Sequence, residues 1–192
     1  PGGYVLDSVD ADSDLGGTSV LRLGSTTASS FSFITLDVVG ATASVSANAS
    51  PIAAGPDDGF GFASFSGAPT SNATLDVPVA SAFTAPAPDS VLAAGTLFTW
   101  DNALADSPGY IMTVSPVDGS GTRVTLYSGG TPSLAFPDLS PLNAVLETES
   151  YRVRVITFSP GLSADGFLTT APVMPAGASS GSFSSALFVN GP

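Results

Sequence analysis

Hydrophobic and polar positions alternate with a period of two over much of this chain. The clearest case is the run ETESYRVRVITFSPG, in which Tyr151 and Val153 fall on one parity and Arg152 and Arg154 on the other. A period of two places successive side chains on opposite faces of a β-sheet. We therefore expect a strand over residues 150–158, with Tyr151 and Val153 inside and the two arginines on the outer face.

Segments with this pattern recur along the chain and are separated by turns rich in Gly, Pro and Asp, which is typical of β-sandwiches. Long stretches with the spacing of an amphipathic helix are absent from the sequence. The strands that the pattern predicts lie near residues 3–9, 18–24, 31–39, 41–47, 59–66, 73–80, 96–101, 109–115, 122–128, 132–136, 150–158, 166–173 and 182–189.

The run ASAFTAPAPD, residues 80–89, is the best candidate for a domain boundary. Its alternating Ala and Pro favour an extended segment that cannot join a central strand. We therefore predict an all-β protein of two tandem antiparallel β-sandwich domains, residues 1–82 and 83–192. The residues that would form the core of the first domain are Phe31, Phe33, Ile34, Leu36, Val38, Phe60, Phe62, Leu75, Val77 and Val79.

The second half resembles a fibronectin type III domain, a member of the immunoglobulin-like β-sandwiches. GTLFTWDNALADSPGYIMTVSP carries Trp100 on one strand and Tyr110 at the start of the next, and LSPLNAVLETESYRVRVITF carries two leucines shortly before Tyr151. The resemblance covers roughly residues 85–174 and implies a seven-stranded sandwich with these aromatics inside. It also implies a tyrosine corner, in which the Tyr151 hydroxyl bonds to a backbone group a few residues upstream.

A further strand follows that resemblance, over residues 182–189, and has no assigned partner in its own domain. Left in water it would expose apolar side chains beside unpaired backbone groups. We expect it to complete another sheet by β-augmentation, either that of the first domain or that of a neighbouring subunit. The residues expected to make this subunit or interdomain contact are Phe183, Leu187, Phe188 and Val189.

Composition and charge exclude several classes of function. The 192 residues are 43% hydrophobic and 10% charged, enough apolar side chains for a buried core. The net charge of −12 with only four arginines argues against nucleic acid and anionic lipid as partners. The chain has no His, Cys or Lys, which rules out disulfides, zinc-thiolate sites and the usual nucleophile–base pairs. The long uncharged stretches are broken by Pro, Gly and Ser, so we expect no membrane insertion.

The sharpest acidic cluster is DSVDADSDLGG near the N-terminus, with Asp7, Asp10, Asp12 and Asp14. Alternate aspartates in a loop can converge oxygen ligands on Ca²⁺. The last three match the first ligand positions of an EF-hand loop, but leucines stand where the turn glycine and the bidentate glutamate belong. The cluster is therefore a candidate calcium site, and the alternative is a solvated loop that keeps an edge strand from pairing wrongly.

Other polar candidates carry weaker signals. Glu147 and Glu149, two residues apart, have the spacing of a glycosidase pair if that stretch is extended, but solvated turn charge explains them equally simply. Asp57 and Asp58 belong to a PDDG turn. Asn72 begins an N-glycosylation sequon, Asn-Ala-Thr.

Exposed aromatic side chains could form a platform for sugars, and the candidates are Tyr127, Phe136 and Phe167; each could instead pack between sheets. The start at Pro1, without a methionine or signal region, favours a processed and exported protein. We expect no enzyme, but a secreted or cell-surface structural protein: a self-associating subunit of a filament, surface layer or adhesive appendage, assembled through β-strand contacts. The alternative is a secreted glycan- or protein-binding module stabilised by calcium.

Overall fold

The computed structural model describes residues 3–15, 20–34, 38–68, 72–101, 104, 109–160 and 177–192. Within these residues the chain is all-β, as the alternation predicts. None of the helical segments in the described part is long and apolar enough to cross a membrane. The elements are β1 (Tyr4–Asp14), β2 (Val20–Thr26), β3 (Thr42–Pro51), β4 (Phe60–Gly67), β5 (Phe83–Ala85), β6 (Leu97–Trp100), β7 (Gly109–Pro116), β8 (Val124–Gly129), β9 (Ser133–Ala135), the 3-10 helix η1 (Ser140–Leu142), β10 (Ser150–Ser159), β11 (Gly177–Phe183) and β12 (Leu187–Asn190).

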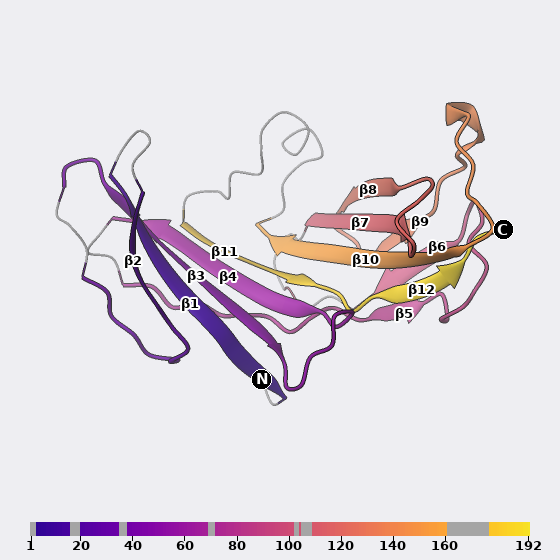
Figure 1. The fold of residues 1–192 in the computed structure, drawn as a ribbon. Helices are drawn as coiled ribbons and strands as arrows, with labels where there is room; N and C mark the ends of the chain where they lie inside the picture. The colour runs from indigo at the N-terminus through magenta and orange to yellow at the C-terminus, as the bar shows by residue number, and fades with distance from the viewer. Residues whose placement is uncertain are drawn as a thin grey trace.

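One long antiparallel sheet runs through both halves of the chain. Its order is β2-β1-β3-β4-β11-β10-β7-β8, and β12 pairs with β10 beside β11 (Figure 1). Strand β11 comes from the C-terminal tail, which we define as residues 177–192, and lies between β4 and β10. The first half (residues 1–82) and the second half (residues 83–192) therefore share one hydrogen-bonded sheet. A second sheet, β5-β6-β9, contains strands of the second half alone.

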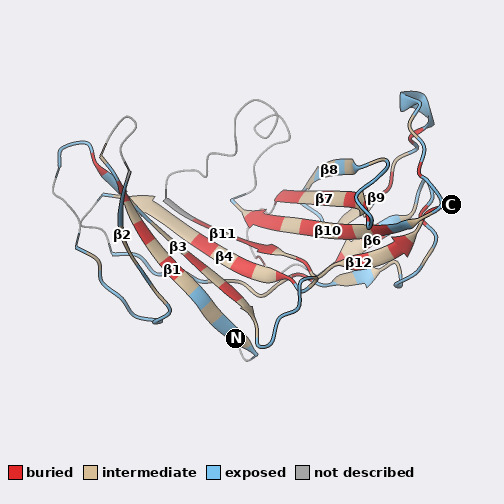
Figure 2. Ribbon diagram, viewed as in Figure 1, coloured by how far each residue is buried: buried red, intermediate tan, exposed pale blue. Residues whose placement is uncertain are grey.

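The second half is built around a core of large side chains between these two sheets. The burial along β7 and β10 alternates, so that Tyr151, Val153 and Val155 are buried while Arg152 and Arg154 lie on the outer face (Figure 2). This confirms the predicted parity of residues 150–158. The cluster consists of Leu92, Phe98, Trp100, Tyr110, Met112, Val114, Phe136, Leu139, Leu146, Tyr151, Val153, Val155, Leu187 and Val189.

The expected tyrosine corner is present. Tyr151 has no solvent-exposed surface, and its hydroxyl oxygen accepts a hydrogen bond of 2.9 Å from the backbone N–H of Glu147. The same hydroxyl donates to Glu147 Oε2, also at 2.9 Å. Burial, with the adjacent Glu147 carboxylate, raises the pKa of Tyr151 to about 12. The hydroxyl therefore stays protonated and locks the turn before β10 onto the strand that follows it.

The first half differs, because its described residues form one sheet covered by irregular segments. The described parts of two predicted strands, 31–39 and 73–80, are not strands. Segments 28–31 and 73–77 instead lie over β1 and β3 and cover the buried face of the sheet. The residues buried on β1, β3 and β4 are small, namely Val9, Ala11, Ser13, Ala47, Ala49, Gly61 and Ala63.

A strap of residues 77–82 crosses from the first half to the second over a row of small residues. A Cβ on Gly61 would overlap the carbonyl oxygen of Pro78, so only glycine lets the strap lie this close. Further along, the Ser81 hydroxyl lies 3.2 Å from that of Ser182 on β11 and 3.4 Å from that of Thr157 on β10. These hydroxyls satisfy one another where the strap is fully buried.

Three sequence predictions about particular elements need correction or fall outside the structure. Residues 80–89 are not wholly a linker, because Phe83–Ala85 forms strand β5 at the edge of the second sheet. On β4 the buried face is the opposite of the predicted one: Phe60 and Phe62 are half-buried, and Gly61 and Ala63 are the buried residues. The predicted strand at 166–173 lies outside the described residues.

Candidate functional site

The C-terminal tail connects the two halves of the sheet. Strand β11 pairs along its whole length with β4, from Gly177↔Ser66 to Phe183↔Phe60, and its last residues also pair with the end of β10. Strand β12 pairs with the beginning of β10, with Tyr151 opposite Val189. The prediction of one strand over 182–189 without a partner in its own half is therefore wrong in part. The tail forms two strands: β11 joins the sheet of the first half at β4, which was one of the two expected pairings, and β12 completes the sheet of the second half.

The residues between β11 and β12 are hydrogen-bonded to neighbouring segments. The Ser184 N–H donates to the carbonyl of Val155 at 2.8 Å, and the Val155 N–H donates to Ser184 Oγ at 2.9 Å. The Ala186 N–H donates to the carbonyl of Asp57, in the turn between β3 and β4, at 2.8 Å. The serine side chain thus replaces a missing ladder hydrogen bond, and the strand switches neighbours without leaving a buried amide unpaired.

The four tail residues expected to make contacts fall into two groups. Leu187 and Val189 are buried in the core of the second half. Phe183 lies on the opposite face and stacks on Phe60 of β4, with 4.5 Å between the ring centroids. Phe188 is also on that outer face, with the guanidinium of Arg152 5.7 Å from its ring centroid. Their contacts lie within the chain and join β11 to β4 and β12 to β10.

An ion cluster beside these aromatics was not found from the sequence. Asp57 Oδ1 lies 3.2 Å from Arg152 Nε and 3.4 Å from an Arg154 nitrogen, and Arg154 also donates to the carbonyl of Pro56 at 2.8 Å. All three charged side chains are about one-third exposed, so each pair contributes modestly to stability. The outward parity of the arginines and the PDDG turn were visible in the sequence, but nothing linked positions a hundred residues apart.

The acidic residues near the N-terminus lie on a strand and not in a loop. Strand β1 is paired on both sides, with β2 and β3, and Asp10, Asp12 and Asp14 alternate with buried residues along it. Carboxylates two apart on a strand point the same way but stand roughly 6–7 Å apart, so they do not converge. Among the described residues no group of three acidic side chains is placed to hold a metal ion.

Two of these aspartates have other partners. Hydrogen bonds from Ser8 and Ser25, together with the charge of Arg22, hold the pKa of Asp10 below its ordinary value. Asp7 accepts a hydrogen bond of 2.5 Å from the Ser50 hydroxyl on β3. Cross-strand pairing of this kind fixes the register of the outer face.

Glu147 and Glu149 form a carboxylate cluster with Asp118 at one end of the second half. The Thr122 N–H and the Tyr151 hydroxyl donate to Glu147 and lower its pKa, whereas burial and the Asp118 charge raise the pKa of Glu149. Gly121, with φ of 86°, lies against both, since a Cβ there would be 2.7 Å from Glu147 Oε2. The role that this geometry gives Glu147 is to hold the tyrosine corner.

The remaining predicted positions are dispersed. Phe136 is buried in the core, Tyr127 is 39% exposed on β8, and Phe167 lies outside the described residues, so no aromatic platform is formed by the described two. Asn72 is exposed in the irregular segment after β4, an accessible position for a glycan.

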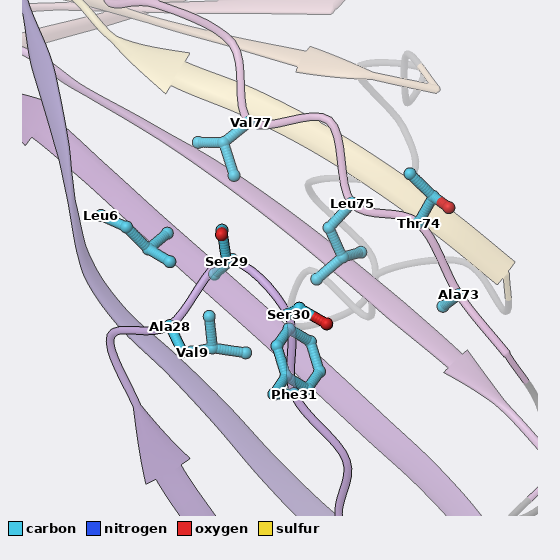
Figure 3. Close-up of a pocket in the computed structure, with 11 residues that line it drawn as sticks. Leu6, Val9, Ala28, Ser29, Ser30, Phe31, Ala73, Thr74, Leu75 and Val77 are labelled. Carbon is cyan, nitrogen blue, oxygen red and sulfur yellow. The ribbon is translucent and has the colours of Figure 1, made fainter.

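A hollow in the first half lies between its covering segments. A cleft of about 380 Å³ opens above β1 and β3, between segments 28–31 and 73–77. Leu6 and Val9 approach it from β1, Leu75 and Val77 from the opposite side, and Phe31 lies between them (Figure 3). The sequence pattern predicted Phe31, Leu75 and Val77 as core residues. It did not predict the cleft between the segments that carry them.

The ends of the long sheet are also exposed features. Strands β2 and β8 are its two edges, and each pairs with one neighbour among the described strands.

No protein-family model matches this chain, and comparisons with curated proteins and with solved structures likewise find no match.

Proposed function

We propose that this chain is a non-enzymatic, extracellular structural subunit that associates with copies of itself through its β-strand edges. The observation that carries the proposal is the position of the two edges, β2 and β8, at opposite ends of one continuous sheet (Figure 1). Pairing β8 of one copy with β2 of the next joins two different surfaces. Such a contact repeats without closing on itself, unless the rotation happens to generate a ring, and it builds a filament.

The composition of the edges supports this mode of contact. Natural proteins use charged side chains, Pro or bulges to prevent an edge strand from pairing with another chain. Strand β8, Val124–Gly129, contains none of these protective residues. Strand β2 carries one arginine, which pairs with Asp10 on the neighbouring strand, and one irregularity in its register with β1 at Leu23, so it is more protected than β8. Among the described strands neither β2 nor β8 has a second neighbour, which supports pairing with a further strand.

Two further observations support the class of protein. The chain has no His, Cys or Lys, so catalytic pairs that need a His or Lys base or a Cys nucleophile are unavailable. The second half combines a β5-β6-β9 sheet, a β12-β10-β7-β8 sheet and a tyrosine corner, which supports the proposal that it is a fibronectin type III-like module. Sandwiches of this kind are common in cell-surface proteins, which favours an extracellular setting.

The test is the assembly state of edge variants. Leu21→Lys on β2 and Thr125→Lys on β8 each place a charge at one edge, and Leu142→Lys is the matched control on η1, where the leucine is 75% exposed. Light scattering after size exclusion and negative-stain microscopy should show polymers for the wild type and the control, and monomers for either edge variant. A wild-type chain that stays monomeric at every concentration, or edge variants that polymerise like the control, would refute the proposal.

A further inference from the structure

The cleft of the first half follows from how that half is covered. The sheet beneath it carries small buried side chains, of which Val9 and Ala47 line the floor. The strap lies directly on the sheet over Gly61, but segments 28–31 and 73–77 diverge above β1 and β3. Small floor residues and diverging covers leave a volume of about 380 Å³. Interiors are otherwise packed with few voids larger than a water molecule.

The chemistry of the lining defines what can occupy this space. None of the described residues that line the cleft is ionisable. Its walls are the side chains of Leu6, Val9, Leu75 and Val77, and its polar side chains are the hydroxyls of Ser29, Ser30 and Thr74 (Figure 3). The exposed surface of the lining is divided about evenly between apolar and polar atoms. Ligand sites likewise combine apolar walls with polar groups that fix orientation, although their walls are usually more apolar.

Size and charge narrow the class further. A volume of about 380 Å³ falls within the roughly 300–1,000 Å³ of small-molecule sites, and it exceeds the about 150 Å³ apolar cavity that accommodates benzene. The chain carries a net charge of −12, which repels anions, and the described lining residues include no carboxylate to hold a cation. The matching ligand is therefore neutral.

We propose that this cleft is a binding site for a small, uncharged molecule with an apolar body and polar atoms, whose body lies against Leu6, Val9, Leu75 and Val77 and whose polar atoms face the hydroxyls of Ser29, Ser30 and Thr74. The site belongs to the first half alone. It does not depend on strand-edge assembly, so the two proposals stand or fall separately.

The experiment uses N-phenyl-1-naphthylamine, an uncharged dye of two aromatic ring systems that fluoresces in apolar surroundings. Ala28→Leu and Ala73→Leu each add bulk at an exposed position that lines the cleft, and Ala94→Leu makes the same change at an exposed position in the second half. The wild type and Ala94→Leu should bind one dye per chain with equal affinity. Each cleft variant should bind at least tenfold more weakly while melting at the temperature of the control.

Two further readouts keep the proposal open to refutation. Saturating dye should raise the melting temperature of the wild type and of Ala94→Leu but not of Ala28→Leu, because a ligand that binds only the folded state stabilises it. The sulfonated analogue 8-anilinonaphthalene-1-sulfonate should bind at least tenfold more weakly than the neutral dye. Dye binding that does not saturate, or that the cleft variants leave unchanged, overturns the site. Equal binding of the sulfonate overturns the assignment to neutral ligands.

Discussion

The two halves of this protein bury their sheet in different ways. In the second half, two sheets enclose Trp100, Tyr110, Phe98 and other large side chains. In the first half, the buried face carries Ala, Ser, Gly and Val, and irregular segments cover it. Large side chains bury more apolar area per residue and hold two sheets about 10 Å apart. Small ones allow backbone to lie directly on the sheet but contribute less hydrophobic free energy.

The difference implies that the first half depends on its attachments. Among the described strands its sheet continues into the second half only through β11, and its cover is held by the strap at Gly61 and Ser81. The Ala80 N–H, at the strap, also donates to the hydroxyl of Tyr4 on β1 at 3.0 Å. The second half should keep its structure under changes that disrupt the first half, whereas changes to the shared tail should affect both.

Deleting residues 177–192 should have the largest effect. The deletion removes the only strand between β4 and β10 in the described sheet, together with Leu187 and Val189 from the second core. We expect the cooperative melting transition to disappear, monitored by near-ultraviolet circular dichroism of Trp100. Deleting Gly191 and Pro192 alone, which leaves both tail strands in place, is the control. A chain without 177–192 that melts cooperatively at the wild-type temperature would show that the tail is an accessory.

Removing one core side chain from each half compares their packing directly. Trp100→Ala should lower the free energy of unfolding by roughly 3–5 kcal/mol, because the indole is 3% exposed and its loss leaves a large cavity. Val9→Ala, on the floor of the first half, should cost about 1.5–2 kcal/mol. Urea denaturation measures both. Equal losses would mean that the two halves are packed alike.

Gly61→Ala tests how closely the strap must approach the sheet. The new methyl group would overlap the Pro78 carbonyl, so the strap has to move, at a cost of about 1–3 kcal/mol. Gly129→Ala on β8 is the matched control, since nothing lies within 4 Å of its Cβ position. Urea melts should separate the two variants. If both behave alike, the small-residue row is not what positions the strap.

Two carboxylates, one in each half, should show opposite dependence on pH. The pKa of Asp10 is lowered in the folded state, so its carboxylate stabilises the fold above its unfolded pKa and that contribution disappears as the pH falls through the folded pKa. The pKa of Glu149 is raised, so its ionisation destabilises the fold as the pH rises through its unfolded and then its folded pKa. Hence at pH 7 Asp10→Asn should lower the melting temperature and Glu149→Gln should raise it.

Both differences should shrink as the pH approaches 3, because Glu149 becomes protonated and Asp10 takes up a proton in the unfolded state before it does so in the folded state. Thermal melts of the two variants and the wild type across pH 3–7 provide the measurement. A Glu149→Gln variant that melts lower than the wild type at pH 7 would contradict the repulsion between Glu149 and Asp118.

The sequence by itself determined the class of structure and the packing of the second half. Alternation at Tyr151 and Val153 predicted both the strand and its buried face, because the period of two is a local property of an extended backbone. Trp100 and Tyr110 predicted a core, since side chains of that size must leave water wherever they can. The resemblance implied a hydrogen bond between the Tyr151 hydroxyl and the backbone a few residues upstream, and the Glu147 N–H donates that bond. It satisfies the buried hydroxyl, as a buried polar group requires.

Tertiary structure alone decided the partners of each strand and the layout of the first half. On β4, alternation offered two faces and could not say that the strap would cover Gly61 and leave Phe62 on the other side. The tail contains apolar residues of both parities, and only the presence of β4 and β10 on either side determined where it pairs. The ion pairs of Asp57 with the two arginines join segments that are far apart in sequence. The cleft is likewise lined by segments that are far apart in sequence. Such contacts depend on which surfaces pack together in the folded chain, and a local pattern of side chains does not specify that packing.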